Sequence, residues 1–515
     1  MSDPRSAVAA RTPTRVVTNA SANAVGQAAS ALASFICVPI YLHLLGAEAI
    51  GLIGFALGFQ ALVRVLDLGM SSAVVRHMAR LAGRPARADE LAEFFLTFER
   101  LFAAAAAAIG IVTLGLAPLV ATHWLRGQHL SHGQLVFAVA AICVQAALLF
   151  MATFYHGTLI GLERQVQLNR IRVAEVLASQ FGAALLLSAW AARVEVLFGW
   201  QLAVTAAALV AYARAATRAL PAGRGAGHFA LSHVRTVWAF AVGMAGISVT
   251  GTIITNMDKM LLGKWLRLDG FGYYTLAFYG ASLLSTLLVA PLFNALFPRA
   301  CDLVERADAA GERRLYHTAL QALVTLVWPV AVILCVFAHP LLHLWIGDAA
   351  AVAAAAAVLP LLAAGVALNT LMVPAYMIQL AHAWTALGVV LNVALIAVFG
   401  PLLFVLTSRW GIAGAAANYA LMQGTYLLTG MPLTHRRLLR GALREVVFRD
   451  LMPGIALCCA AFVGLLTVRD SILETPVVAR YALIGGAWLA LAASTALASS
   501  RVRPVLAWRW ALFSE

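Results

Sequence analysis

The sequence predicts an all-α integral membrane protein with about fourteen transmembrane helices. Hydrophobic residues make up 62% of the chain and charged residues 11%, and the mean hydropathy is +0.88. A soluble core does not require this composition, whereas a bilayer-spanning helix needs about 20 mostly apolar residues. Runs of that kind are centred near residues 30, 60, 108, 145, 182, 206, 249, 284, 329, 363, 394, 421, 458 and 487. Few residues remain for a soluble domain.

The distribution of arginine predicts that both termini are cytoplasmic. Short loops rich in Lys and Arg stay on the cytoplasmic side, whereas acidic residues contribute little. With the N-terminus inside, the inner connections and tails hold 26 of the 36 Lys and Arg residues, and the outer loops hold seven. The net charge of +14 is therefore explained by an inner face attracted to anionic membrane lipid. It requires no nucleic-acid partner.

A similarity between the first and seventh spans predicts an internal repeat. Leu44-Leu45-Gly46 precedes Gly51, which opens the second span, as Leu261-Leu262-Gly263 precedes Gly272, which opens the eighth. An even spacing of six spans makes the two halves parallel, and such halves usually hold a substrate cavity near the midplane. We therefore expect two parallel six-helix lobes and two C-terminal helices. The expected divisions are a cytoplasmic tail (1–13), an N-terminal lobe (14–218), a cytoplasmic linker (219–235), a C-terminal lobe (236–434), a basic cytoplasmic loop (435–450), two additional helices (451–500) and a cytoplasmic tail (501–515).

Polar side chains in the first two spans are candidates for the substrate cavity. Asn19, Asn23 and Gln27 recur every four residues on one face of the first span, and a polar stripe in a membrane helix faces protein or water. Hydrogen bonding between helices explains the stripe equally well. Arg64 and Asp67 are spaced to form an ion pair on one helix face, with a buried structural pair as the alternative. A cation such as Arg64 suits a phosphate-bearing substrate.

The seventh span carries adjacent opposite charges in an apolar helix. An ionised side chain costs about 2.5–3.5 kcal/mol at the centre of a membrane helix on insertion scales, so such residues indicate a functional site by default. Asp258 and Lys259 point in different directions around the helix, and each is expected to need its own partner. Lys259 and Asn256 complete the candidate substrate-binding set. The candidates for ion coupling are the acids Asp67, Asp258 and Glu175.

Other polar residues of the spans have a structural interpretation and an alternative as sugar contacts. Tyrosines at the start of the eighth span are expected to anchor it at the membrane interface, with stacking on a sugar ring as the alternative. Amides in the tenth to twelfth spans are expected to bridge helices, with hydrogen bonding to sugar hydroxyls as the alternative. The tyrosines are Tyr273, Tyr274 and Tyr279, and the amides are Asn369, Gln379, Asn392, Asn418 and Gln423.

No sequence motif indicates an enzyme, a cofactor or a metal site. Neither lysine lies in a Walker A setting, and the motifs H-E-x-x-H and G-x-S-x-G are absent. The six cysteines lie in predicted spans or in an inner loop, so disulfides are not expected. We expect a transporter without a cofactor.

Two segments resemble a known family. Residues 256–303 and 19–81 are similar to the polysaccharide and O-antigen (Wzx-type) flippases of the multidrug/oligosaccharidyl-lipid/polysaccharide (MOP) exporter superfamily. The shared features include the first-span asparagine, Pro39 near the outer end of that span, the Leu-Leu-Gly turn, and the aspartate and glycine that end the second span. The remainder of the chain agrees only in the number of spans.

This resemblance implies a fold like that of multidrug and toxin extrusion (MATE) transporters, and a bacterial inner-membrane location. It implies that the protein moves an oligosaccharide repeat unit, linked to undecaprenyl pyrophosphate, from the inner to the outer face by alternating access, for O-antigen, capsule or exopolysaccharide export. No bond is made or broken. The implied partners are the lipid-linked oligosaccharide, membrane lipid, and the polymerase and chain-length proteins of the pathway.

Four alternative functions remain open. One is a purely structural membrane scaffold, which would not need the charged side chains inside the membrane. An ion-coupled multidrug exporter of the same superfamily shares the fold, but usually has twelve spans. A peptidoglycan-precursor flippase also has fourteen spans, but usually more arginines in the first two. An integral-membrane polysaccharide polymerase is expected to have a large outer loop, and no predicted outer loop exceeds about fifteen residues.

Overall fold

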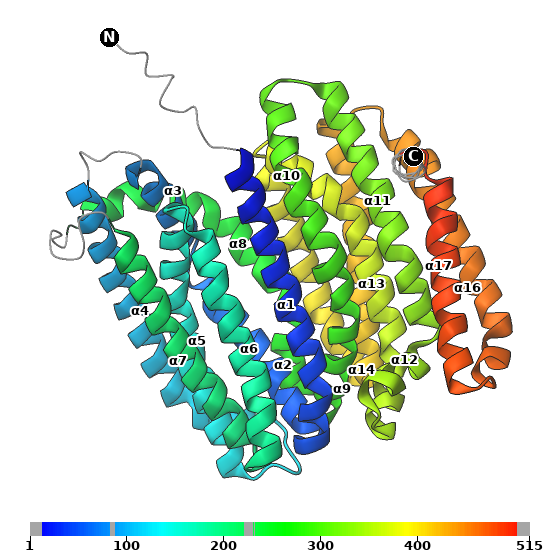
Figure 1. The fold of residues 1–515 in the computed structure, drawn as a ribbon, viewed down its shortest axis with the longest axis horizontal. Coiled ribbons are helices and arrows are strands. Elements are labelled where there is room, and N and C mark those ends of the chain that lie inside the picture. Colours follow the sequence, from blue (N-terminus) through cyan, green and yellow to red (C-terminus); the bar gives the residue numbers. More distant parts are fainter. Residues whose placement is uncertain (1–12, 83–87, 221–229, 231, 502–515) are drawn as a thin grey trace. The chain divides into compact units, whose positions relative to one another are not determined.

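The computed structural model describes residues 13–82, 88–220, 230 and 232–501, and every regular element within these ranges is helical (Figure 1). Side chains are not described for the first half of the first helix or for residues 232–245. The elements are α1 (Pro13–Leu45), α2 (Ala47–Val65), α3 (Met70–Ala82), α4 (Ala88–His123), α5 (His132–Gly161), α6 (Gln165–Ala189), α7 (Val194–Ala219), α8 (Ser232–Trp265), α9 (Leu268–Leu283), η3 (Leu284–Val289), α10 (Ala290–Glu305), α11 (Ala309–Val336), α12 (Ala338–Ile346), α13 (Ala349–Ala381), α14 (Thr385–Arg437), α15 (Leu443–Glu445), η4 (Val446–Leu451), α16 (Met452–Leu473) and α17 (Val477–Ala498).

The predicted transmembrane helices are confirmed. Within the described ranges, twelve helical segments are long and apolar enough to cross a membrane. One of these, α14, contains two predicted spans, which are separated by a break in helical geometry at Gly411 (φ 56°, ψ −134°). The predicted span near residue 249 lies in α8. Each of the fourteen predicted centres therefore lies in a helix, and the chain is a multi-pass membrane protein.

Two π-helical segments interrupt this regular pattern, and each is followed by a proline. The segment η3 ends two residues before Pro291, and η4 ends two residues before Pro453. Proline has no N–H to donate and its ring clashes with the carbonyl four residues earlier, so the preceding turn cannot keep regular α-helical bonding. A widened π turn absorbs this mismatch.

Two turns at positions that the internal repeat makes equivalent have the same backbone geometry, which also occurs between α10 and α11. The turn between α5 and α6 and the turn between α13 and α14 both place their middle residue at positive φ, Glu163 at 58° and Ala383 at 53°. The backbone hydrogen bonds are also the same in both turns. The three turn residues, 162–164 and 382–384, donate in order to the carbonyls four, three and five residues earlier. Each preceding helix is also capped by a side chain, Ser131 for α5 and Asp348 for α13. These similarities agree with the predicted repeat, after which the chain continues into α16 and α17.

The chain forms two compact units. Unit 1 consists of Met1–Leu45 and Phe55–Asn256, and unit 2 of Gly46–Gly54 and Met257–Glu515. The division falls within α2 and α8 and not in the 219–235 segment, most of which lies outside the described residues. The predicted boundaries, which follow membrane topology, remain a prediction.

Aromatic side chains dominate the core of unit 1. Phe95 and Phe102 of α4 pack against Phe154 of α5, with ring centroids 5.2 and 5.4 Å apart. The amphipathic helix α3 covers the same core with Val74 and Met78, while its arginines are exposed. The connection between the second and third spans, which is predicted to lie on the inner side, is helical as far as Ala82.

In unit 2, the two glycines that align the repeats contact each other's helices. A Cβ atom added to Gly51 would lie 2.2 Å from the carbonyl oxygen of Leu268, and one added to Gly272 would lie 2.1 Å from that of Ala47. The crossing of α2 and α9 therefore depends on both glycines, because only glycine allows the two backbones to approach this closely.

Candidate functional site

Helices α2, α5 and α6 bring three basic side chains together in unit 1. Arg64, in the last turn of α2, interacts electrostatically with Arg172 of α6, and both arginines interact electrostatically with His156 of α5. The Nε2 atom of His156 is buried and has no hydrogen-bond partner among the described residues. Two positive charges are thus brought together from α2 and α6, which are about a hundred residues apart in the sequence.

One carboxylate lies within this basic cluster. Glu175, one turn after Arg172 on α6, accepts a hydrogen bond of 2.8 Å from the hydroxyl of Tyr212 on α7 and is attracted to Arg172. The ring of Tyr212 also packs edge-on against His156, with centroids 4.4 Å apart. We call Arg64, His156, Arg172, Glu175 and Tyr212 the basic cluster.

The two arginines of the basic cluster are exposed to solvent. Both lie in helices that are apolar enough to span a membrane. Ionised side chains in such helices face the protein interior or water, because lipid does not solvate them. Two exposed guanidinium groups on such helices are able to bind an anion with directional hydrogen bonds.

The predicted ion pair between Arg64 and Asp67 is wrong. Helix α2 ends at Val65, and the chain turns through Leu68 and Gly69 at positive φ, so the helical spacing on which the pair depends is absent. The carboxylate of Asp67 instead accepts hydrogen bonds from the backbone N–H of Ser71 at 3.1 and 3.2 Å and from its hydroxyl at 2.7 Å. Asp67 thus holds the start of α3.

In unit 2, Asp258 and Lys259 pair with each other. Both are buried, and the Nζ atom of Lys259 lies 3.3 Å from Oδ1 of Asp258. The expectation that each needs a separate partner is therefore wrong, because the long lysine side chain folds back along the helix. Further contacts come from α9, where the hydroxyl of Tyr274 donates to Asp258 Oδ2 at 2.8 Å and the ring of Phe278 lies 3.7 Å from Nζ.

Aromatic and amide side chains continue this polar region of unit 2. Phe278 contacts Tyr419 edge-on at 5.8 Å, and Tyr419 hydrogen-bonds to Gln423, both on α14. The side chain of Gln423 accepts a hydrogen bond of 3.1 Å from Asn369 on α13. These four side chains are half-buried. An apolar ring beside amide groups is suited to a sugar, which presents both C–H faces and hydroxyl groups.

The remaining candidate residues are less closely connected. The side-chain amide of Asn256 bonds to the carbonyl of Thr252 in its own helix at 3.0 Å. Gln27 is half-buried. Asn19 and Asn23 lie on α1, but their side chains are outside the described set. Tyr274, expected as an interfacial anchor, is fully buried beside Asp258, and that expectation is wrong for it.

The sequence analysis did not identify several residues of the basic cluster and of the polar region of unit 2. From the sequence, Arg172 is expected only as a topogenic arginine and as a structural partner of Glu175, and the structure confirms that these two charges interact. His156, Tyr212 and Phe278 carry no motif, and their contacts join helices that the sequence cannot place side by side. Among the described residues, no three His, Cys, Asp or Glu side chains gather in a way that could hold a metal ion.

Comparison with solved structures identifies the fold. The lipid II flippase MurJ in an inward closed conformation is similar with a TM-score of 0.70 at 10% identity, over 92% of this chain and 98% of that chain. An inward-facing multidrug resistance MATE family transporter of the MOP superfamily is similar with a TM-score of 0.65 at 12% identity, over 82% and 99%. The MATE transporter VcmN of Vibrio cholerae in its bent form gives 0.54 at 14% identity, over 84% and 99%.

The family follows from the sequence itself. No curated protein sequence gives a significant match. The profile of a family described as "Polysaccharide biosynthesis protein" matches residues 42–354, which is more than half of the chain. Together with the MOP superfamily fold, this confirms the resemblance inferred from the first and seventh spans. The chain belongs to the polysaccharide biosynthesis protein family.

Proposed function

We propose that this protein moves an oligosaccharide linked to undecaprenyl pyrophosphate across the bacterial inner membrane, from the cytoplasmic face to the outer face. Membership of a polysaccharide biosynthesis family and a fold shared with a lipid II flippase support this proposal. Both termini are then cytoplasmic. The reaction is alternating access of a lipid head group, in which no covalent bond changes, so the chain acts as a transporter and not as an enzyme.

The observation that carries the proposal is the pair of solvent-exposed arginines, Arg64 and Arg172, on membrane-spanning helices of one unit. The two guanidinium groups repel each other electrostatically, so binding of an anion between them is favourable. A pyrophosphate supplies that anion and accepts paired hydrogen bonds from planar guanidinium groups. Multidrug substrates, which are often cationic, do not need such a site.

The aromatic and amide side chains of unit 2 support a saccharide as the rest of the head group. Phe278 and Tyr419 offer ring surface, while Asn369 and Gln423 offer amide donors and acceptors. The buried pair of Asp258 and Lys259 is internally neutral, so in this proposal it positions Phe278 and Tyr274 and does not bind pyrophosphate. Arg172 therefore replaces Lys259 as the second phosphate-binding cation.

Of the three candidate acids, Glu175 is the best choice for ion coupling. Asp67 is engaged by three hydrogen bonds from Ser71, and Asp258 by Lys259 and Tyr274. Glu175 also accepts a hydrogen bond, from Tyr212, but it is in addition attracted to Arg172, the group that we assign to phosphate. A proton or cation on Glu175 would release Arg172 for the substrate, which couples the two binding events.

The test is to deplete the protein and to measure lipid-linked sugars in the membrane. We expect complete repeat units on undecaprenyl pyrophosphate to accumulate facing the cytoplasm. Wild-type protein and Arg170→Ala should clear them, because Arg170 is also exposed on α6 but lies two residues away from Arg172. Arg64→Ala and Arg172→Ala should not, whereas Arg64→Lys should restore part of the activity because it retains the charge without the fork geometry.

Other results would contradict the proposal. Complete units that reach the outer face but remain unpolymerised would indicate a polymerase. Unchanged lipid-linked sugars would direct attention to drug export or to peptidoglycan precursors. The role of Glu175 is tested separately with Glu175→Gln in vesicles, where flipping should lose its response to an imposed pH gradient. Asp67→Asn, with equal expression, should keep that response.

A further inference from the structure

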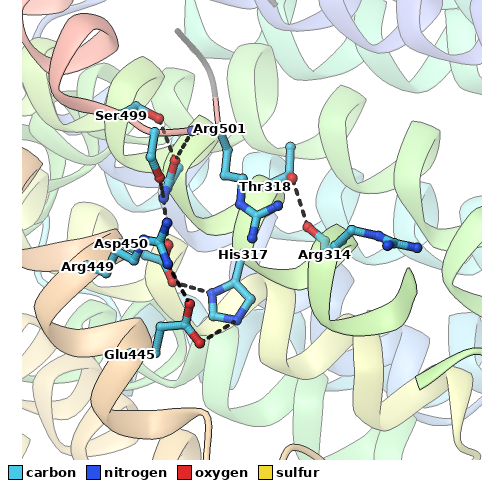
Figure 2. A network of polar contacts seen from close by, with 10 residues as sticks. Arg314, His317, Thr318, Glu445, Arg449, Asp450, Ser499 and Arg501 are labelled. Carbon is cyan, nitrogen blue, oxygen red and sulfur yellow. Dashed lines mark hydrogen bonds and ion pairs between the residues drawn. The ribbon is translucent and has the colours of Figure 1, made fainter. Parts of the chain in front are cut away.

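A second polar network, in unit 2, is not used by the proposed function. It lies at the N-terminal end of α11 and joins this helix to η4 and to the end of α17 (Figure 2). Its members are buried, with exposed fractions of 4% for His317, 2% for Gln321 and 5% for Asp450. Buried polar groups of this kind stabilise a structure only when all of them are satisfied.

Both polar atoms of the Gln321 side chain are hydrogen-bonded within this network. Its Nε2 atom donates to Asp450 Oδ1 at 2.6 Å and to Ser500 Oγ at 3.2 Å. Its Oε1 atom accepts from the hydroxyl of Ser499 at 2.6 Å and from the backbone N–H of Arg501 at 2.8 Å. One side chain of α11 therefore holds both the start of α16 and the end of α17.

His317 lies between two carboxylates. Its Nδ1 atom is hydrogen-bonded to Asp450 Oδ2, and its Nε2 atom lies 4.0 Å from Glu445 Oε2. Glu445 has a second partner, Arg449, at 3.2 Å, whereas the bonded partners of Asp450 within the described chain are His317 and Gln321. His317 is thus the side chain that can bring a positive charge to the buried carboxylate.

The π-helical segment η4 explains how both carboxylates reach one histidine. Asp450 lies in η4, and Glu445 lies just before it in α15. Residues five apart are separated by about 140° around an α-helix, but they align on one face of a π-helix, where each turn bonds five residues back. Pro453 favours this widened turn.

Helices α16 and α17 also contact α11 and α12 at a distance from the polar network. Val332, Ile333 and Val336 of α11 form an apolar cluster with Cys458 of α16 and Ile484 of α17. The hydroxyl of Tyr481 donates to the carbonyl of Pro340 at 2.9 Å. In Figure 1, α16 and α17 lie together at one edge, next to α11. Apolar contacts thus hold the pair along its length, while the network is its polar attachment.

We infer that His317, Asp450 and Glu445 form a proton-sensitive latch that holds α16 and α17 against α11. With a protonated imidazole, the buried carboxylate of Asp450 is paired and Glu445 is attracted from the other side. When the imidazole loses its proton, Asp450 keeps only neutral donors, and a buried carboxylate without a counter-charge is unfavourable. The attachment is therefore strong at low pH and weakens as the pH rises.

Other titratable groups lie around the latch. Tyr316 packs edge-on against His317, with centroids 6.0 Å apart, and also contacts His435 of α14 at 5.4 Å. Arg314, Arg449 and Arg501 are the charged side chains drawn around the network in Figure 2. Arg449 is bonded to Glu445, and the Arg501 backbone N–H is bonded to Gln321. Of these titratable groups, His317 is the one that is hydrogen-bonded to Asp450.

A cysteine pair can report the docking of α16 on α11. An ideal Cβ atom at Gly454 of α16 lies 3.8 Å from the Cβ atom of Val324 on α11, within the range of about 3.5–4.5 Å found in disulfides. Val324→Cys also removes the Cγ1 atom that would lie 2.5 Å from this new Cβ. The experiment uses full-length protein in nanodiscs, with the six native cysteines replaced and Val324→Cys and Gly454→Cys introduced.

The rate of disulfide formation is measured between about pH 5.5 and about pH 8.5, on either side of the usual histidine range. Thiol reactivity itself depends on pH, so the rate is divided by that of the same protein with His317→Gln. We expect this ratio to fall by about threefold or more as the pH rises, because a charge-assisted hydrogen bond is roughly twice as strong as a neutral one. His339→Gln, an exposed histidine of α12, should behave like the parent.

Two further variants distinguish a latch from a purely structural contact. In the cysteine-pair protein that also carries Asp450→Asn, the rate divided by that of the His317→Gln protein should not depend on pH. Glu445→Gln, at a site that is about half exposed and tolerant of substitution, should reduce the pH dependence of the ratio. If the parent and the Glu445→Gln and His317→Gln proteins all give the same pH profile, the latch is overturned. Lipid-linked sugar clearance has no part in this measurement, so the latch and the proposed function can fail independently.

Discussion

Replacing Gly272 with alanine should loosen the contact between α2 and α9. The new Cβ atom would lie 2.1 Å from the carbonyl oxygen of Ala47 and 3.1 Å from the backbone nitrogen of Gly51. Carbon and oxygen atoms in close contact lie about 3.3 Å apart, so the helices must separate by about 1 Å. Because both atoms belong to backbones, no change of rotamer relieves the contact.

Two opposing contributions determine the size of the effect. Overpacking usually costs about 1–3 kcal/mol, whereas alanine in a helix is favoured over glycine by about 0.5–1 kcal/mol. The separation also opens the reciprocal contact of Gly51 with Leu268. We expect a net loss of about 1–2 kcal/mol, which lowers the midpoint of thermal unfolding by a few degrees at about 2 °C per kcal/mol for a large domain.

The assay is thermal unfolding of purified full-length protein in detergent, followed by tryptophan fluorescence. Gly280→Ala is the matched control, because it lies on the same helix and its Cβ atom would make an ordinary contact of 3.6 Å with Leu359. Adding Ala47→Gly to Gly272→Ala should give no rescue, since the obstacle is the carbonyl oxygen. Equal midpoints for Gly272→Ala and Gly280→Ala, or a rescue by Ala47→Gly, would refute the reasoning.

Three further outcomes are expected in the same assay. Tyr274→Phe should lower the free energy of unfolding by about 1.5–3 kcal/mol, because it removes a hydrogen bond to a buried carboxylate. Tyr273 is half-buried, and Tyr273→Phe should change the free energy of unfolding by less than about 0.5 kcal/mol. Similar values for both variants would contradict the assigned contact of Tyr274 with Asp258. Asp348→Ala should cost about 0.5–2 kcal/mol as the loss of an N-cap, since its carboxylate accepts from the N–H of Ala351 at 2.8 Å, and an unchanged midpoint would argue against the cap. Gly182→Ala should also destabilise, because its Cβ atom would lie 2.5 Å from Nε1 of Trp200; here, in contrast to Gly272, adding Trp200→Phe should recover part of the loss, and no recovery would show that the backbone is the obstacle.

The sequence by itself determined the membrane-spanning architecture. Apolar runs of sufficient length give helices because backbone polar groups in a bilayer must be satisfied within the segment, and this requirement is local. The glycines Gly51 and Gly272 also marked the repeat correctly, because a close helix crossing demands glycine wherever the partner lies. The break at Gly411 and the helix α3 were less evident, since they depend on how neighbouring helices pack.

Only the tertiary structure decided which polar residues act together. Arg64 and Asp67 are close in sequence but separate where α2 ends, and Asp258 and Lys259 pair although a rigid helix would point them apart. Helices α6 and α7 bring together Arg172, Glu175 and Tyr212. His317 is hydrogen-bonded to Asp450, which lies more than a hundred residues later in the chain. Helix periodicity fixes the direction of a side chain within one helix, but the sequence does not encode which helix stands opposite, and that arrangement determines the partner of each charge.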